Sequence, residues 1–311
     1  MEVSRIVLGC GNFGGIGSAP ELFGQGESRD EAFALMDAAW AAGVTVLDTA
    51  ASYGGGRSER WVGEWRSERG APVTLSTKVF WSVTGDPADR GLSHDRILRE
   101  LDGSLARLQA ERVDMYLTHE PDDETPIAET LGALDEVVRA GKASAIGASN
   151  LDGAGLEQAL ETSDRLGFTR FGWVQNEYSL LRRAVEADVL PVCEQEGLGF
   201  TPFSPLAGGW LTGKYRRGEA YPSGSRMTLR PDPYDDLVSD ATFDGLEAFA
   251  ADAAARGVEP ATLAVAWVLG HPQVTGVVVG PRSPEQLETA LAAAELELTQ
   301  QERDHLAGLF A

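Results

Sequence analysis

The sequence has few cysteines, no long apolar run and little positive charge. Its 311 residues include two cysteines, Cys10 and Cys193, which provide neither a disulfide framework nor metal-ligand spacing, so we expect no metal site and a reducing compartment. No apolar run reaches the ~18 residues that span a bilayer. Residues 1–5 lack the charged and apolar regions of a signal peptide. These absences predict a cytoplasmic protein with no membrane partner.

Basic residues are outnumbered, because 48 acidic side chains face 26 basic ones and the formal charge is −22. Such a chain repels nucleic-acid backbones and anionic membrane surfaces, so nucleic acid is not expected as a partner. Any anionic ligand has to be held by a local positive site. Basic residues near loops therefore become informative.

Short apolar, β-branched runs alternate with longer amphipathic stretches, which is typical of repeated βα units with a parallel sheet. Length alone is compatible with one barrel or two smaller domains. The expected strands are Arg5–Leu8, Val44–Leu47, Val73–Thr77, Val113–Thr118, Ala143–Ala148, Phe171–Gln175, Leu198–Thr201 and Thr275–Val279. Eight strands favour an α/β (β/α)8 TIM barrel, residues 1–311 forming a single domain, over a doubly wound open sheet, which usually has five to seven strands.

The expected helices lie between and after these strands. Their ranges are Arg29–Ala42, Arg57–Arg69, Ser93–Leu108, Thr125–Ala140, Leu151–Thr162, Ala184–Glu196, Thr242–Arg256, Pro260–Leu269, Pro284–Ala294 and Thr299–Phe310. The segment Phe203–Ser239, rich in Pro and Gly, predicts a long loop after strand 7. It would lie on the face where barrels keep their active sites.

Ionisable residues occur at the ends of three successive expected strands. Asp48, Lys78 and His119 follow strands 2, 3 and 4, and Tyr53 comes five residues after Asp48. Lys78 could stabilise the Tyr53 phenolate, Asp48 could hold Lys78, and His119 could orient a carbonyl oxygen or relay a proton. Each residue alone has an ordinary explanation: a helix cap, a solvated lysine, a loop histidine or a packing tyrosine. Their coincidence at one rim favours chemistry.

These residues stand in stretches that resemble the aldo-keto reductase superfamily, and the resemblance covers essentially the whole chain. The matching stretches are DTAASYGGGRSE at 48–59, LSTK at 75–78, YLTH at 116–119, GKASAIGASN at 141–150, QNEYSLL at 175–181 and TPFSPLAGG at 201–209. The resemblance implies a barrel that binds NADPH without a Rossmann domain. It also implies reduction of a small-molecule aldehyde or ketone by hydride transfer, with Tyr53 as general acid supported by Asp48, Lys78 and His119.

The same resemblance implies the cofactor contacts. Ser149, Asn150 and Gln175 would hold the nicotinamide carboxamide, and Phe203 would stack on the ring, where an aromatic face suffices. The remaining expected cofactor residues are Asn12, Phe13, Ser204, Pro205, Leu206, Gly208, Gly280, Arg282, Ser283 and Gln286.

The segment from Val279 to Gln286 also indicates a phosphate site without reference to any family. A strand ends at Gly280 and a helix begins near Pro284, so free backbone N–H groups lie beside Arg282 and Ser283. Alternatively, Arg282 caps a neighbouring acidic helix. The resemblance implies that this segment holds the 2′-phosphate of NADPH. Relatives commonly have asparagine where this chain has Ala290, so its adenine contacts differ.

A second glycine motif is better explained by the first βα loop. Residues 9–14, GCGNFG, match G-x-G-x-x-G after a strand, but a Rossmann site requires a helix to start at once. Here the chain continues through further glycines to Arg29. Many relatives begin with a β-hairpin under the barrel, whereas only four residues precede Arg5 here.

The substrate pocket and two alternative functions complete the expectations. The walls of the substrate pocket should include Phe13, Phe23, Trp81, Tyr178 and the 203–239 loop. For Trp81, packing in the hydrophobic core is nearly as good an explanation. Lys78 could instead form a Schiff base in a lyase. Some members of the superfamily serve channels, so a non-catalytic NADPH-binding regulatory subunit is the other alternative. The sequence specifies neither the carbonyl compound nor an oligomeric state.

Overall fold

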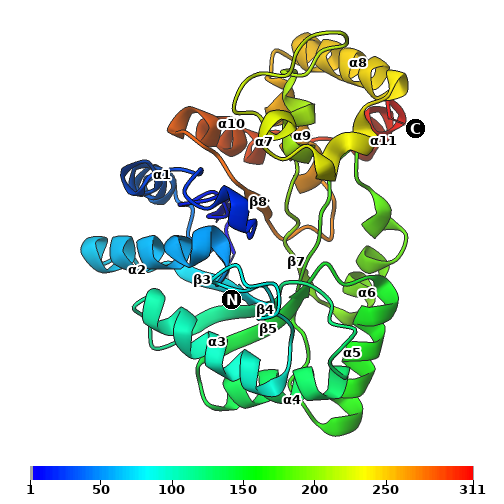
Figure 1. Ribbon diagram of the computed structural model, residues 1–311. Coiled ribbons are helices and arrows are strands. Elements are labelled where there is room, and N and C mark those ends of the chain that lie inside the picture. The colour runs from blue at the N-terminus through cyan, green and yellow to red at the C-terminus, as the bar shows by residue number, and fades with distance from the viewer. Residues whose placement is uncertain (1–2, 311) are drawn as a thin grey trace.

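Eight parallel strands form the centre of the molecule. The computed structural model describes residues 3–310 (Figure 1). Met1 and Glu2, which belong to the segment predicted to lack a signal peptide, lie outside the described residues. The strands are β1 (Ile6–Gly9), β2 (Val46–Asp48), β3 (Thr74–Val79), β4 (Val113–Thr118), β5 (Ala143–Ser149), β6 (Trp173–Gln175), β7 (Gly199–Phe200) and β8 (Val277–Val279). Their order is β7-β6-β5-β4-β3-β2-β1-β8, with every neighbouring pair parallel.

The two outer strands of this order also meet each other. The backbone N–H of Thr275 donates to Phe200 O at 2.9 Å, and the N–H of Val278 donates to Pro202 O at 2.8 Å. A parallel bridge joins Phe200 to Val274. These bonds connect β7 to β8, so the sheet curls into a barrel without a free edge. The expected (β/α)8 fold is confirmed, and the doubly wound open sheet is excluded.

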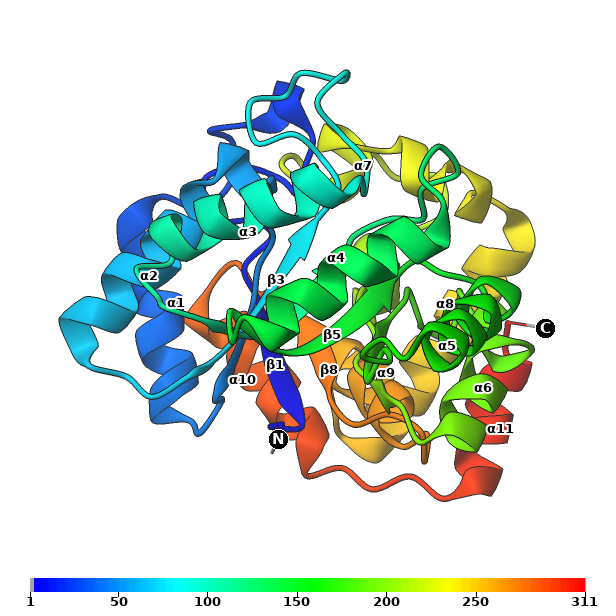
Figure 2. The ribbon, with the colours of Figure 1, turned by 90° about the horizontal axis from the view of Figure 1, so that it is seen from below.

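Helices surround the strands (Figure 2). They are α1 (Arg29–Ala41), α2 (Arg57–Arg69), α3 (His94–Arg107), α4 (Ile127–Arg139), α5 (Gly153–Leu166), α6 (Val189–Glu196), α7 (Arg226–Leu229), α8 (Asp240–Arg256), α9 (Pro260–Leu269), α10 (Pro284–Ala294) and α11 (Gln300–Gly308). Helices α1 to α6 contact one another in chain order, while α10 contacts both α9 and α1. Within residues 3–310, none of these helices is both long enough and apolar enough to cross a membrane.

Two apolar layers hold the barrel together. Val7, Val46, Met115, Leu117 and Val278 form a cluster inside it. A much larger cluster, which includes the neighbouring strand residues Leu8, Leu47 and Tyr116, packs the outer surface of the strands against the helices. Successive side chains of each strand therefore alternate between interior and helix layer, which is the period-2 geometry of a strand.

The structure corrects two element predictions. The expected helix Ala184–Glu196 is divided into a 3-10 turn at Ala184–Glu186 and α6, because the Asp188 side chain accepts a hydrogen bond from the N–H of Val189 and starts a new helix there. The expected loop Phe203–Ser239 contains α7 and 3-10 turns at Ala207–Thr212 and Asp232–Leu237. Those helical pieces are too short to show an apolar period in the sequence.

Candidate active site

A cavity of about 1190 Å³ opens at the carboxyl ends of the strands. Its wall is formed by residues at the ends of the strands or in the loops that follow them, and all eight strands contribute. Cavities of drug-sized ligands usually measure ~300–1,000 Å³. This one is large enough for a dinucleotide with a second small molecule beside it.

Strand geometry directs the expected catalytic side chains to the same place. Val46 points into the barrel, so Asp48, two residues later, points the same way at the end of β2. Leu117 has the same relation to His119, which follows β4. Lys78 was expected after a strand but lies within β3, because that strand extends to Val79. Asp48 and His119 line the cavity, and Lys78 lies beneath it with 1% of its surface exposed.

Lys78 and Asp48 form a buried ion pair. The ammonium Nζ donates to Asp48 Oδ2 at 2.5 Å and to the backbone oxygen of Thr49 at 2.9 Å. Asp48 Oδ1 accepts from Ser76 Oγ at 2.9 Å. Burial alone would lower the pKa of Lys78, but the neighbouring Asp48 and Tyr53 raise it above its usual value. The lysine is therefore held charged.

Tyr53 and His119 meet above this pair. The Tyr53 hydroxyl lies 3.4 Å from His119 Nε2, and Lys78 Nζ lies 5.2 Å from the centre of the Tyr53 ring. Burial lowers the pKa of His119 well below its usual value, and Lys78 adds to that effect, so the ring is neutral near pH 7. A neutral imidazole can donate from one nitrogen and accept at the other.

The pKa of Tyr53 differs from the simple expectation. Burial raises it above the usual value for tyrosine, and the nearby Lys78 ammonium offsets only part of that rise. In this state of the protein the phenol is protonated at neutral pH. Lys78 therefore limits the rise rather than producing a net decrease, because removal of the hydroxyl from water is the larger effect.

The residues expected around a nicotinamide lie together along the next part of the cavity. Ser149, Asn150, Gln175 and Phe203 all line it, and Asn150 Nδ2 donates to the His119 backbone oxygen at 3.0 Å. Gln175 Nε2 donates to Asp48 Oδ1 at 3.1 Å, which links this group to the ion pair. Further cavity-lining residues from the expected set are Asn12, Ser204, Pro205, Leu206, Gly208, Gly280, Arg282 and Gln286.

Two of these lining residues have unusual backbone conformations. Asn150 has φ = 59° and Ser204 has φ = 56°, in the left-handed region that non-glycine residues seldom adopt. Such strain persists only where the surrounding structure maintains it, and it is common at ligand sites. Asn150 begins the loop after β5 and Ser204 lies in the segment after β7, and both residues line the cavity wall.

At the far end of the cavity, Arg282 and Ser283 precede α10 as expected. Ser283 Oγ accepts a hydrogen bond from the N–H of Gln286 at 3.4 Å and so caps the helix; it borders a neighbouring recess rather than the main cavity. Arg282 Nε donates to Glu27 Oε1 at 2.9 Å. Burial raises the pKa of Glu27, and this contact with Arg282 opposes the rise.

Four basic residues of the cavity wall were not predicted, and one of them is Arg90 in the loop after β3. The other three, Lys214, Arg226 and Arg230, line the cavity from the segment after β7. Arg226 Nη2 reaches across the cavity to Asn12 Oδ1 at 2.6 Å. Burial lowers the pKa of Lys214, and Arg226 and Arg282 contribute to that decrease. One signal was available: five basic residues fall between 214 and 230 in an otherwise acidic chain.

Three expected wall residues do not line the cavity. Phe13 is 1% exposed and belongs to the outer apolar cluster. Phe23 is not among the lining residues, and its ring lies where a Cβ on Gly55 would come within 3.2 Å of it. Tyr178 is fully buried, and its hydroxyl donates to Glu186 at 2.6 Å. Trp81 is the remaining aromatic residue that was predicted for the pocket outside the 203–239 segment, and it does line the cavity. Sequence alone did not distinguish an aromatic residue at a strand end from one turned into the core.

Tyr178→Phe provides a test of this placement. Removing the hydroxyl leaves Glu186 and Arg303, which lie 2.6 and 3.3 Å from it, without that partner. We expect the free energy of unfolding to fall by about 1–3 kcal/mol, as for other buried polar groups left unpaired. The KM values for cofactor and substrate should stay unchanged. Urea unfolding with steady-state kinetics measures both, and a raised substrate KM would return Tyr178 to the pocket.

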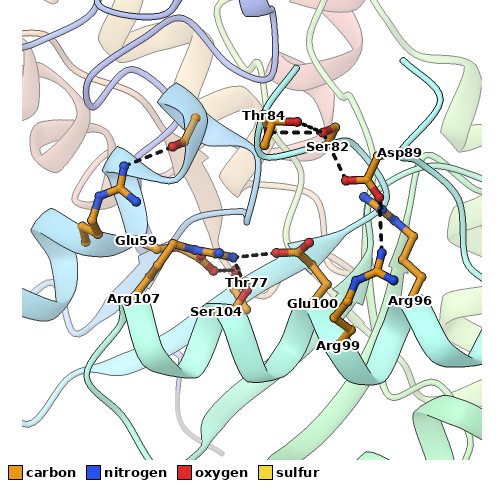
Figure 3. Close-up of polar contacts among 12 residues, drawn as sticks. Glu59, Thr77, Ser82, Thr84, Asp89, Arg96, Arg99, Glu100, Ser104 and Arg107 are labelled. Atoms are coloured by element: carbon orange, nitrogen blue, oxygen red, sulfur yellow. Dashed lines mark hydrogen bonds and ion pairs between the residues drawn. The ribbon is translucent and has the colours of Figure 1, made fainter. Parts of the chain in front are cut away.

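A polar network supports the outer side of β3 and the loop that follows it (Figure 3). Glu59 is fully buried and accepts hydrogen bonds from Thr77 Oγ1 and Arg107 Nε, both at 2.6 Å. Farther along α3, Arg96 contacts Asp89, which also accepts from Ser82 Oγ at 3.2 Å. Thr77 precedes Lys78, and Ser82 lines the cavity. The network thus fixes the backbone on both sides of Trp81.

Comparison with known proteins identifies one family across almost the whole chain. Residues 5–309 match the model of the Aldo/keto reductase family. An uncharacterised oxidoreductase of Bacillus subtilis, YrpG, is 37% identical over 96% of this chain and 89% of its own length. A probable voltage-gated potassium channel subunit beta of Oryza sativa is 36% identical over 88% of this chain and 85% of its own length.

A solved structure shows the same architecture. The glycerol dehydrogenase of Gluconobacter oxydans superposes with a TM-score of 0.84 at 27% sequence identity, covering 99% of this chain and 92% of that one. The likeness therefore extends over the whole barrel.

Proposed function

Because the chain belongs to the aldo/keto reductase family, we propose that it is an NADPH-dependent oxidoreductase that reduces a small aldehyde or ketone to an alcohol. The observation that carries this proposal is the convergence of Tyr53, His119 and the buried Lys78–Asp48 pair at one end of the cavity. A protonated phenol, a neutral imidazole and a fixed ammonium suit the protonation of a carbonyl oxygen.

Each of these residues has a distinct part in the proposed reaction. Tyr53 donates its proton to the oxygen that gains negative charge, and His119 orients that oxygen by a hydrogen bond. Lys78 stabilises the resulting phenolate from 5.2 Å below the ring. Asp48 is a positioning residue, since its contact at 2.5 Å fixes the ammonium in place.

The cavity suits NADPH, which when bound would supply the hydride. Phe203 offers an aromatic face beside Ser149, Asn150 and Gln175, which carry donors and acceptors for an amide. Lys214, Arg226 and Arg282 provide positive charge for phosphate groups at the other end. Ser225 Oγ lies in this part of the wall and has no hydrogen-bond partner among the described residues. These features support an extended dinucleotide along the cavity.

A direct assay tests the proposed reaction. The purified chain should oxidise NADPH in the presence of a panel of aliphatic, aromatic and hydroxylated aldehydes and ketones, measured as loss of absorbance at 340 nm. Tyr53→Phe is the control for contaminating reductases. If the wild-type chain binds NADPH but the absorbance stays constant with every carbonyl compound, reductase activity is excluded.

NADPH binding without any loss of absorbance would favour a non-catalytic regulatory subunit. The specific observation for this alternative is the 36% identity to a protein whose name describes a potassium channel subunit. The complete set of Tyr53, Lys78, Asp48 and His119 favours the enzyme. A Schiff-base lyase is disfavoured, because its lysine must be a neutral nucleophile, whereas Asp48 holds Lys78 charged.

Arg282→Ala should reveal whether the far end of the cavity recognises the 2′-phosphate of NADPH. A charge-assisted hydrogen bond contributes about 1.5–3 kcal/mol, so we expect NADPH affinity to fall roughly ten- to a hundredfold. NADH has no group at this position, and its affinity should stay nearly constant. Titration of tryptophan fluorescence with each cofactor measures both constants. Equal losses for the two cofactors would place the 2′-phosphate elsewhere.

A further inference from the structure

The guanidinium at the proposed 2′-phosphate site is largely engaged by the protein itself. Arg282 Nε donates to Glu27 Oε1 at 2.9 Å, and Nη1 donates to the backbone oxygen of Gly224 at 3.0 Å. Among residues 3–310, no hydrogen-bond partner contacts its Nη2. A phosphate that binds to Arg282 therefore finds Nη2 free, but it also lies near the Glu27 carboxylate, which is already bound to Nε.

Glu27 is held firmly in this position. Its backbone N–H donates to Asn12 O at 2.9 Å, and its own carbonyl accepts from the N–H of Gly14 at 3.0 Å. The preceding Gly26 approaches this loop so closely that a Cβ would lie 1.8 Å from Asn12 O. The Glu27 side chain is only 3% exposed, whereas that of Arg282 is 47% exposed. The carboxylate is therefore a fixed part of the site, and the guanidinium is the more exposed partner.

A carboxylate and a guanidinium at an adenosine ribose have opposite effects on cofactor choice. Arginine accommodates the 2′-phosphate of NADP-type cofactors, whereas a nearby acidic residue repels that phosphate and so shifts the preference toward the unphosphorylated cofactor. Here the two side chains contact each other directly. Glu27 Oε2 is also buried without a hydrogen-bond partner among the described residues, and Arg282 and Arg226 are the basic groups that oppose the rise in the pKa of this carboxyl caused by burial.

We propose that Glu27 is a specificity-determining residue that lowers the preference for NADPH over NADH by competing with the 2′-phosphate for Arg282. This inference rests on the proposed function, in which Arg282 binds that phosphate. Specificity is a difference between two affinities, and a like charge beside the phosphate reduces one of them without changing the other. The protein would then accept both cofactors more evenly than its arginine alone would dictate.

Glu27→Gln separates this effect from mere positioning of Arg282. Glutamine keeps an oxygen that can accept from Arg282 Nε, but it carries no charge. Removing one like charge near the phosphate should tighten NADPH binding about tenfold, with NADH changed by less than twofold. Fluorescence titrations at pH 8 give both dissociation constants. The control is Glu288→Gln, which removes one charge from the exposed surface of α10 and should alter neither.

The outcomes differ for the two proposals. If Glu27 only positions Arg282, NADPH binding will weaken or stay constant in Glu27→Gln, and the competition is refuted. Equal tightening of both cofactors also refutes it. In an Arg282→Ala background the gain in NADPH affinity should fall below threefold, and a full gain there would show that Arg282 is not the group for which Glu27 and the phosphate compete.

If Arg282→Ala leaves the ratio of NADPH affinity to NADH affinity unchanged, the proposed phosphate site itself is refuted. Glu27→Met, which removes the charge with a different side chain, should reproduce the tenfold gain.

Discussion

Replacing Tyr53 with phenylalanine should lower carbonyl turnover about 10²–10⁴-fold, which is the usual contribution of a general acid. The ring remains, so its packing and its contact with His119, at a centroid distance of 5.3 Å, persist. The hydroxyl that lies 3.4 Å from His119 Nε2 is lost. Because the phenol acts only as the carbonyl oxygen gains charge, NADPH affinity should stay within about twofold of wild type.

Stopped-flow and steady-state kinetics with the best carbonyl substrate measure this effect, and fluorescence titration measures cofactor binding. Tyr178→Phe is the matched control, since it removes a buried phenolic hydroxyl away from the cavity. It should keep wild-type turnover at temperatures well below its melting point. Wild-type turnover in Tyr53→Phe would exclude Tyr53 as the acid, whatever the control shows.

Lys78→Met should reduce turnover about 10²–10³-fold, comparable with the loss of one preorganised electrostatic group. The pH profile carries the sharper information. Tyr53 must be protonated to act as an acid, so activity declines as pH rises through its pKa. Burial raises that pKa and Lys78 opposes the rise. Without the ammonium the pKa rises further, and the alkaline limb of the profile should move to higher pH.

The same substitution leaves Asp48 buried without its partner, which costs about 3–5 kcal/mol of stability. The double variant Asp48→Asn/Lys78→Met removes both charges and should recover much of that loss while turnover stays low. Lys142→Met is the control, because Lys142 is an exposed lysine paired with Asp102. If the alkaline limb keeps its position in Lys78→Met and in the double variant, Lys78 does not act on the Tyr53 hydroxyl.

Much of the fold follows from local patterns in the chain. The strand Val113–Thr118 and the helices Arg57–Arg69, Pro260–Leu269 and Pro284–Ala294 have the predicted bounds. Their apolar periods are long or their ends are marked by proline or glycine. Bounds were less accurate where the signal was short. For β7 the prediction covered Leu198–Thr201, but regular pairing is limited to Gly199–Phe200.

The clustering of the residues proposed for catalysis could be predicted, because it depends on two simple features. Side chains alternate along strands, and parallel strands end at the same face. Asp48, Lys78 and His119 satisfy both conditions, and Tyr53 follows within a short loop. The direction of the Tyr53 pKa could not be predicted, since burial and the neighbouring charge oppose each other and the balance depends on how much water reaches the hydroxyl.

The sequence by itself therefore determined the eight βα units, the barrel they favour and the residues at the strand ends, because these depend on patterns within a few turns of chain. Only the tertiary structure decided which aromatic residues face the cavity, that Lys214 and Arg226 join its wall, and that Glu27 contacts Arg282. The last two residues are 255 positions apart. Contacts of such range arise when loops from distant strands meet over the barrel, and no local periodicity or propensity encodes them.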